Sequence, residues 1–246
     1  MKKCAFTIVS DDYYYPVGTH TFVNSFIKFH PEIDLFVFRQ DKIQELMKDG
    51  INFYNAKPTF AKLLYDNYDL VVNIDADTVI TGRLTEVFDN VDYEVGAAWN
   101  KNDYEDAAFQ NITAEMYLQA GMVASTSKKF WDIWEEENKL AHLFIRKEND
   151  VLNLVAYNNE EGKKMKLKIF DKKKDYYGCK SLGRELEFYI QDDKLMCRKE
   201  EVKAYHFAKG NVMPKLDFDS MDLTWEVKKW LKDLAYGQSY LIKGIK

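Results

Sequence analysis

The sequence contains few cysteines, and their spacing excludes the disulfide-rich and zinc-binding classes of small domain. Among 246 residues there are three, Cys4, Cys179 and Cys197, and none of them forms a closely spaced metal-binding pair. An odd count with wide spacing favours a reduced compartment over a disulfide framework. We therefore expect a cytoplasmic protein.

Long apolar runs and an excess of positive charge are also missing. The formal net charge of −5 argues against a nucleic-acid binder held by phosphate contacts. No stretch approaches the length of a membrane span. The short apolar run after Lys2 and Lys3 is too brief for a signal peptide, so we expect a first strand there. At 46% apolar and 30% charged residues, the composition is that of a globular protein with a substantial core.

The most informative feature present is an apolar run that ends in two aspartates. The run 70–74 precedes Asp75-Ala76-Asp77, and its β-branched and apolar residues are typical of a buried strand. Ligands bind at the carboxyl ends of such strands in open α/β sheets. Two neighbouring carboxylates repel each other unless a cation or proton intervenes, and Mg²⁺ or Mn²⁺ carrying a polyphosphate suits them. An acidic turn without a ligand is the alternative for this triplet alone.

Strand-like and helix-like segments alternate through the first two-thirds of the chain, which predicts an α/β fold with a mostly parallel, doubly covered sheet. We expect strands at 4–10, 33–38, 70–74, 95–99 and 122–125, and helices at 17–29, 41–48, 59–67, 128–140 and 150–157.

From about residue 162 the pattern changes to short strands between lysine-rich turns. Strands are expected at 166–170, 186–190, 194–197 and 203–207, and they predict a β-rich annex over about 162–202. The segment 221–235 repeats apolar residues at helical spacing, so we expect an amphipathic C-terminal helix. Its polar face carries Lys228, Lys229 and Lys232. Docking on the parent domain is the expected role, and peripheral membrane contact is the alternative.

One of the four histidines lies in a chemically suggestive position. His206 is in a predicted strand, and Ala208-Lys209-Gly210 follows it. A histidine at a strand end before a glycine loop with lysines can supply an imidazole ligand and phosphate-binding amides together. Taken alone, a structural histidine is the simpler interpretation.

Five blocks of the sequence form a recognisable series. They are 10–18 with 24–26, 65–89 around the two aspartates, 117–123, 148–153, and Tyr205-His206-Phe207 with Gly210. In this order they resemble the metal-dependent GT-A glycosyltransferases, particularly the glycogenin-like and lipopolysaccharide-galactosyltransferase-like retaining family. The resemblance covers roughly residues 5 to 215.

The resemblance implies a GT-A, Rossmann-like domain over 1–215, with a helical extension packed on it over 216–246. It also implies a site. Asp75, Asp77 and His206 would ligate Mn²⁺ or Mg²⁺, which holds the diphosphate of a UDP-sugar. Further donor contacts would come from Ser10, Asp12 and Tyr15 at the uridine, and from Lys62, Ala76, Gly210 and Lys215. Gln119 and Asp150 would bind sugar hydroxyls as the catalytic pair.

Several residues depart from the family pattern or admit a second role. Gln119 replaces the usual Asn, and Asn149 replaces the usual Gln. The loop before Gly210 is one residue longer, so either Lys209 or Lys215 supplies the diphosphate-binding charge. These departures leave the donor sugar and the retention of configuration open. Asp150 could instead be a helix N-cap, and Lys62 a solvated helix lysine.

The sequence therefore predicts a hexosyltransferase that uses a UDP-sugar, with UDP-glucose or UDP-galactose favoured, and a glycan hydroxyl as acceptor. A haloacid-dehalogenase-type phosphatase shares the apolar strand ending in Asp-x-Asp, but its later Gly-Asp motif is missing here. A sugar-nucleotide pyrophosphorylase needs a glycine-rich loop after the first strand, and 10–15 contains no glycine. A non-catalytic carbohydrate-binding module is the third alternative. The acceptor and the oligomeric state stay open.

Overall fold

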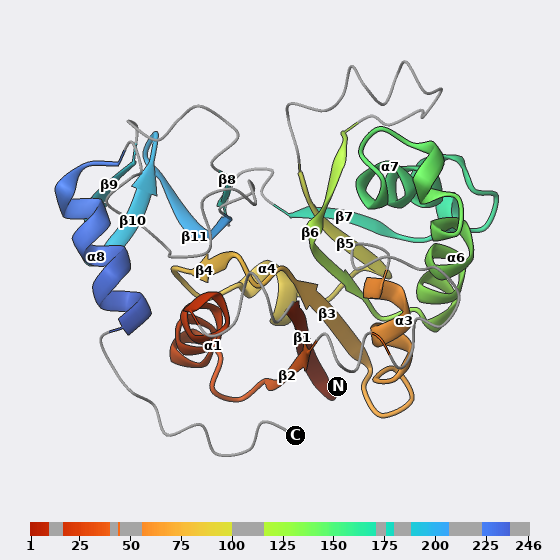
Figure 1. Cartoon of the computed structure of the whole chain (residues 1–246), viewed down its shortest axis with the longest axis horizontal. Coiled ribbons are helices and arrows are strands. Elements are labelled where there is room, and N and C mark those ends of the chain that lie inside the picture. The colour runs from red at the N-terminus through yellow and green to blue at the C-terminus, as the bar shows by residue number, and fades with distance from the viewer. Residues whose placement is uncertain are drawn as a thin grey trace.

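The computed structural model describes residues 1–9, 17–39, 44, 56–99, 116–170, 176–179, 188–206 and 223–236 (Figure 1). The helices are α1 (Val17–Phe29), α3 (Lys57–Lys62), α4 (Thr85–Phe88), α6 (Lys128–Asn138), α7 (Glu148–Asn153) and α8 (Trp225–Tyr236). The strands are β1 (Lys3–Val9), β2 (Asp34–Arg39), β3 (Leu70–Ile74), β4 (Thr78–Ile80), β5 (Val95–Trp99), β6 (Leu118–Ser125), β7 (Leu167–Phe170), β8 (Tyr176–Cys179), β9 (Phe188–Gln191), β10 (Lys194–Cys197) and β11 (Glu200–His206).

The main sheet has six strands in the order β2-β1-β3-β6-β5-β7. Three of its five pairings are parallel, and β6 runs antiparallel to both of its neighbours. All five residues of β3 are buried, as the apolar run predicts. The expectation of an α/β fold with a mostly parallel central sheet is confirmed.

Helices cover both faces of this sheet because alternate residues of each strand point to opposite sides. Phe6 of β1 packs in one core with residues of α3, α6 and α7, including Phe60 and Trp131. Ala5 packs in the other core with residues of α1 and α4, including Phe26. Each large apolar side chain that is fully buried contributes about 1.5–3 kcal/mol relative to exposure. The two cores hold β3 rigidly between them.

A second sheet joins the strand that follows the two aspartates to the strand that carries the late histidine. Its order is β4-β11-β10-β9, and β8 pairs in parallel with β11. In the antiparallel pairing of β4 with β11, Thr78 lies opposite His206. Helix α8 covers this sheet through a buried apolar stripe that includes Val227, Leu231 and Leu234. Figure 1 shows α8 at the outer edge of this sheet, beside β9 and β10.

Several elements differ from the sequence-based expectations. Strands β4 and β8 and helix α4 were not predicted, and β6 begins at Leu118 rather than at residue 122. The strand predicted in the annex at 166–170 is β7, and it pairs in parallel with β5 in the main sheet. Gly96 of β5 makes room for this, since a Cβ there would lie 2.2 Å from the ring of Phe170. Helix α3 begins at Lys57 rather than at Thr59, with a proline in its first turn. The predicted helix 150–157 is α7 followed by a π-helical turn at Leu154–Asn158.

Two further observations complete the comparison with expectation. The helix predicted at 41–48 falls almost wholly outside the described residues, which include Gln44 alone from that segment. Within the described parts of the chain, no helix combines the length and apolar character needed to cross a membrane.

Candidate metal and donor site

Three side chains from two sheets converge where β3 ends. Asp75 directly follows β3, Asp77 directly precedes β4, and His206 is the last residue of β11. Their ligand atoms lie within 4.8 Å of one another. His206 Nε2 is 3.0 Å from Asp77 Oδ1 and 3.7 Å from Asp75 Oδ2. Residues 129 positions apart in the chain therefore meet in one cluster.

Backbone hydrogen bonds hold the two aspartates in place. The amide of Asp75 donates to the carbonyl oxygen of Gly121 on β6, at 2.9 Å. The amide of Thr78 donates back to the carbonyl oxygen of Asp75, at 3.2 Å, and closes a tight turn around Asp77. These two backbone hydrogen bonds thus fix the separation of the two carboxylates.

A buried lysine compensates the negative charge of the cluster. Lys57, at the start of α3, places its ammonium 2.8 Å from Asp75 and 3.0 Å from Glu148, and it donates to the carbonyl oxygen of Ala120. Burial lowers the pKa of Lys57, but the two carboxylates raise it further, so the net shift is upward. Lys57 therefore stays charged although its side chain is only 7% exposed.

The carboxylates respond to this environment in opposite directions. Burial raises the pKa of Asp77, but its interactions with His206 and Lys57 outweigh burial and hold the pKa below the ordinary value. Burial raises the pKa of Glu148 to about 7, against the opposing effect of Lys57 and with a further contribution from Asp75. Asp77 is thus an ionised ligand, whereas Glu148 is close to its titration point near neutral pH.

Gln119 contacts the imidazole ring of His206. Strand β6 extends beyond the end of β3, because Met122 is already opposite Ile74. Gln119 therefore lies under the cluster, where its amide Nε2 is 2.9 Å from Nδ1 of His206. Both side chains are buried, with residue exposures of 6% and 4%.

Helix α7 is fixed to β6 by side-chain amides and a buried carboxylate. Asp150 accepts hydrogen bonds from the Tyr117 hydroxyl at 2.6 Å and the Arg146 amide at 2.8 Å. It is the third residue of α7 and not the N-cap, so its carboxylate reaches back to an amide that precedes the helix. Asn149 accepts from the amide of Ala120, at 2.7 Å. This arrangement puts Glu148 beside Lys57.

The cluster fits a divalent metal. Two carboxylates and one imidazole form a mixed oxygen and nitrogen ligand set, which suits Mn²⁺ and is compatible with Mg²⁺. The side chains of Asp75 and Asp77 remain 25% and 12% exposed, so the carboxylates can be reached from solvent. Among the described residues, the buried Glu148 Oε2 has no hydrogen-bond partner, so it is available to a bound ligand.

Comparison with known proteins identifies the fold of this chain. No protein-family profile and no curated protein matches the chain. Among solved structures, the bifunctional glycosyltransferase WbbM superposes with a TM-score of 0.62 at 14% identity over 97% of this chain. This chain spans 50% of the WbbM chain. The galactosyltransferase LgtC, solved with donor and acceptor sugar analogues, gives 0.57 at 15% identity over 96% of both chains.

A third match is a glycosyltransferase involved in glycosylation of the major capsid of PBCV-1. Its TM-score is 0.55 at 8% identity, over 83% of this chain and 93% of that one. All three neighbours combine identities of 15% or less with coverage of at least 83% of this chain. This chain has the GT-A fold. It resembles the lipopolysaccharide galactosyltransferases of that fold, as the sequence blocks predict.

Within the GT-A fold, the predicted site residues separate into three groups. Asp75, Asp77, His206 and Gln119 come together, with the buried Ala76 between the aspartates. Asp150 is on the neighbouring α7. The donor-site residues Ser10, Asp12, Tyr15, Gly210 and Lys215 lie outside the described residues, as does Lys209.

Lys62, which is expected to contact the donor, lies beside α6, and its donor contact stays a prediction. Its ammonium is 2.6 Å from Glu135 and 3.2 Å from Asp132, both on α6. Among the described residues, Lys57 on the same helix contacts Asp75 of the cluster. Sequence reasoning missed it because the helix was expected to begin two residues later. Glu148 was also missed, although it opens the block 148–153. A lysine directly before a proline at the helix start was the available signal for Lys57.

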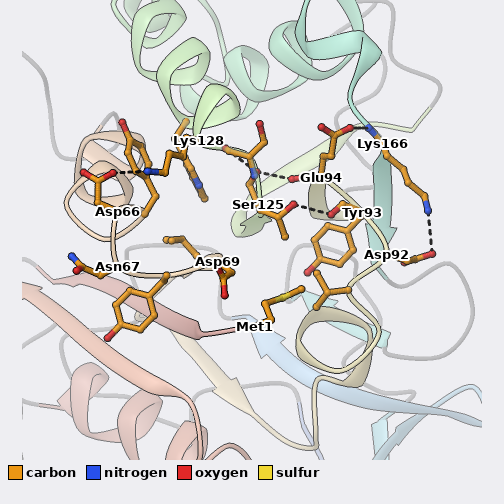
Figure 2. Close-up of a pocket in the computed structure, with 17 residues that line it drawn as sticks. Met1, Asp66, Asn67, Asp69, Asp92, Tyr93, Glu94, Ser125, Lys128 and Lys166 are labelled. Carbon is orange, nitrogen blue, oxygen red and sulfur yellow. Dashed lines mark hydrogen bonds and ion pairs between the residues drawn. The ribbon is translucent and has the colours of Figure 1, made fainter.

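A hollow of about 760 Å³ lies at the opposite ends of the strands of the main sheet and is separate from the cluster (Figure 2). It is lined by residues at the amino end of β3 and the carboxyl end of β6, including Asp69 and Ser125. Figure 2 shows its charged side chains paired with one another, Lys128 with Asp66 and Lys166 with Asp92. The carboxyl ends of parallel strands are the usual ligand edge, and this hollow is not there.

Proposed function

We propose that this protein is a metal-dependent glycosyltransferase that moves a hexose from a UDP-sugar to a hydroxyl of a glycan acceptor. UDP-glucose and UDP-galactose are the favoured donors. The observation that carries the proposal is the convergence of Asp75, Asp77 and His206 at the carboxyl end of β3 in a GT-A fold. The GT-A fold argues against the dehalogenase-type phosphatase alternative.

Asp75, Asp77 and His206 would hold Mn²⁺ or Mg²⁺. When bound, the ion supplies positive charge to the donor diphosphate and to the nucleotide as it departs. Lys57 holds Asp75 at 2.8 Å and orients its carboxylate toward His206. Its positive charge also offsets part of the negative charge of the two aspartates.

The residues of α7 would bind the transferred sugar. Glu148 Oε2 has no partner among the described residues, so a sugar hydroxyl can satisfy it. Asp150 is the second hydroxyl contact, and Tyr117 fixes its orientation. We retain Ser10, Asp12 and Tyr15 as proposed uridine contacts, with Ala76, Gly210 and Lys215 along the diphosphate. Retention of anomeric configuration is part of the proposal and rests on the family resemblance.

The test is a panel of nucleotide-sugars with Mn²⁺, in which release of UDP by donor hydrolysis is measured. The proposal expects turnover with one UDP-hexose, its loss with EDTA, and its loss in Asp77→Ala. The matched control is Asp92→Ala, because Asp92 is an exposed aspartate paired with Lys168 at the far edge of the sheet. Unchanged turnover in Asp77→Ala contradicts the metal role. UDP-sugar binding without turnover would indicate a non-catalytic carbohydrate-binding module instead.

A further inference from the structure

We propose that Gln119 is a positioning residue that sets the tautomer of His206 and so prepares it to bind the metal. The inference rests on the proposed function and adds a role for Gln119 different from the sugar contact expected of it. It depends on two contacts on opposite sides of one imidazole ring. Nδ1 faces Gln119 Nε2 at 2.9 Å, and Nε2 faces Asp77 Oδ1 at 3.0 Å.

These two contacts define which ring nitrogen of His206 carries the proton. An amide nitrogen is only a donor, so Nδ1 of His206 must accept from Gln119 and carries no proton. The ring proton is then on Nε2, where it is donated to the Asp77 carboxylate. His206 is thus a neutral imidazole in the Nε2–H tautomer, and the atom that points at the cluster is blocked by hydrogen.

Binding of a metal requires the other tautomer. His206 would offer a metal ion the lone pair of Nε2, so the ring proton would have to leave that atom and reside on Nδ1. The ring stays neutral, with one proton lost at Nε2 and one gained at Nδ1 through solvent. An Nδ1–H group buried at this position then needs an acceptor, because a buried unpaired donor costs about 1–3 kcal/mol.

Gln119 can donate to Nδ1 in one tautomer and accept from Nδ1–H in the other, without moving its main chain. Its amide has a donor on one side and an acceptor on the other. A half-turn about the last side-chain bond replaces Nε2 by Oε1 against Nδ1, and the hydrogen bond reverses direction. Asn, the residue usual in the family, is one methylene shorter. Histidine ligands commonly depend on such a second partner, and its removal weakens metal affinity about 10–100-fold.

The decisive measurement is Mn²⁺ affinity by titration calorimetry in the absence of any nucleotide-sugar, so that a sugar contact cannot contribute. Gln119→Met keeps the length of the side chain and removes both hydrogen-bonding groups, and we expect an affinity about 10–100-fold weaker. The matched control is Ser125→Ala, at the other end of the same buried strand. The Ser125 hydroxyl donates to the carbonyl oxygen of Glu94, away from the cluster. The control should bind Mn²⁺ like the wild type.

A second measurement needs no variant. Nitrogen-15 chemical shifts of His206 in the wild-type protein should show a protonated Nε2 without metal and a protonated Nδ1 with Mg²⁺. An Nδ1–H ring or an imidazolium in the metal-free protein overturns the inference, as does wild-type affinity in Gln119→Met. Either result would leave the proposed function intact, provided that the wild type binds Mn²⁺. If the wild type bound no metal, both the role of Gln119 and the proposed metal-dependent function would be contradicted.

Discussion

Replacing Lys57 by Met tests the charge balance on which the cluster depends. The substitution keeps a long, unbranched side chain and removes the ammonium that lies 2.8 Å from Asp75 and 3.0 Å from Glu148. Breaking a buried ion pair from one side leaves uncompensated charge, which typically costs about 3–5 kcal/mol. In a protein of this size each kcal/mol lowers the melting temperature by roughly 2–4 °C. We therefore expect a fall of about 6–20 °C for the metal-free protein.

The assay is differential scanning calorimetry in EDTA, with Lys62→Met as the control. Lys62 is on the same helix and also contacts two carboxylates, but its side chain is 34% exposed. Partly exposed ion pairs contribute about 0–1 kcal/mol, so the control should melt within a few degrees of the wild type.

The double variant Lys57→Met/Glu148→Gln sharpens the test. It removes one of the two carboxylates that the ammonium neutralises, so part of the lost stability should return. Equal melting temperatures for Lys57→Met and Lys62→Met would refute the reasoning. The same conclusion would follow if the double variant were no more stable than Lys57→Met alone.

Three further predictions concern the framework of the site. Burial and the nearby Arg83 lower the pKa of His30 from 6.5 to about 4, so the unfolded chain binds a proton first as the pH falls. The free energy of unfolding should then fall by about 3 kcal/mol as the pH falls from 6.5 to 4. Urea titrations should show this fall in the wild type and not in His30→Gln. Gly96→Ala should cost about 1–3 kcal/mol by overpacking against Phe170, and Phe170→Leu should recover part of it in thermal melts. Tyr117→Phe should weaken donor binding, seen as a raised KM in the UDP-release assay, because Asp150 loses the hydroxyl that orients it.

Local sequence patterns predicted most of the described strands and helices, but they missed β4, β8 and α4. The bounds of β3, β5 and β10 coincide with the predicted ranges, as do those of α1. These elements depend on the periodicity of their own residues and on nearby turn signals, which are readable without knowledge of the rest of the chain. Boundaries were less accurate where a helix start depended on a proline, as in α3.

The sequence alone also determined that Asp75 and Asp77 end a buried strand, and the family resemblance added His206 as their partner. Only the tertiary structure decided that β4 pairs with β11, which is the contact that brings His206 to the aspartates. It likewise decided that Lys57 rather than Lys62 enters the cluster, and that Gln119 faces an imidazole. The physical reason is that strand pairing and side-chain burial join segments far apart in the chain, and no local pattern records which partner each segment meets.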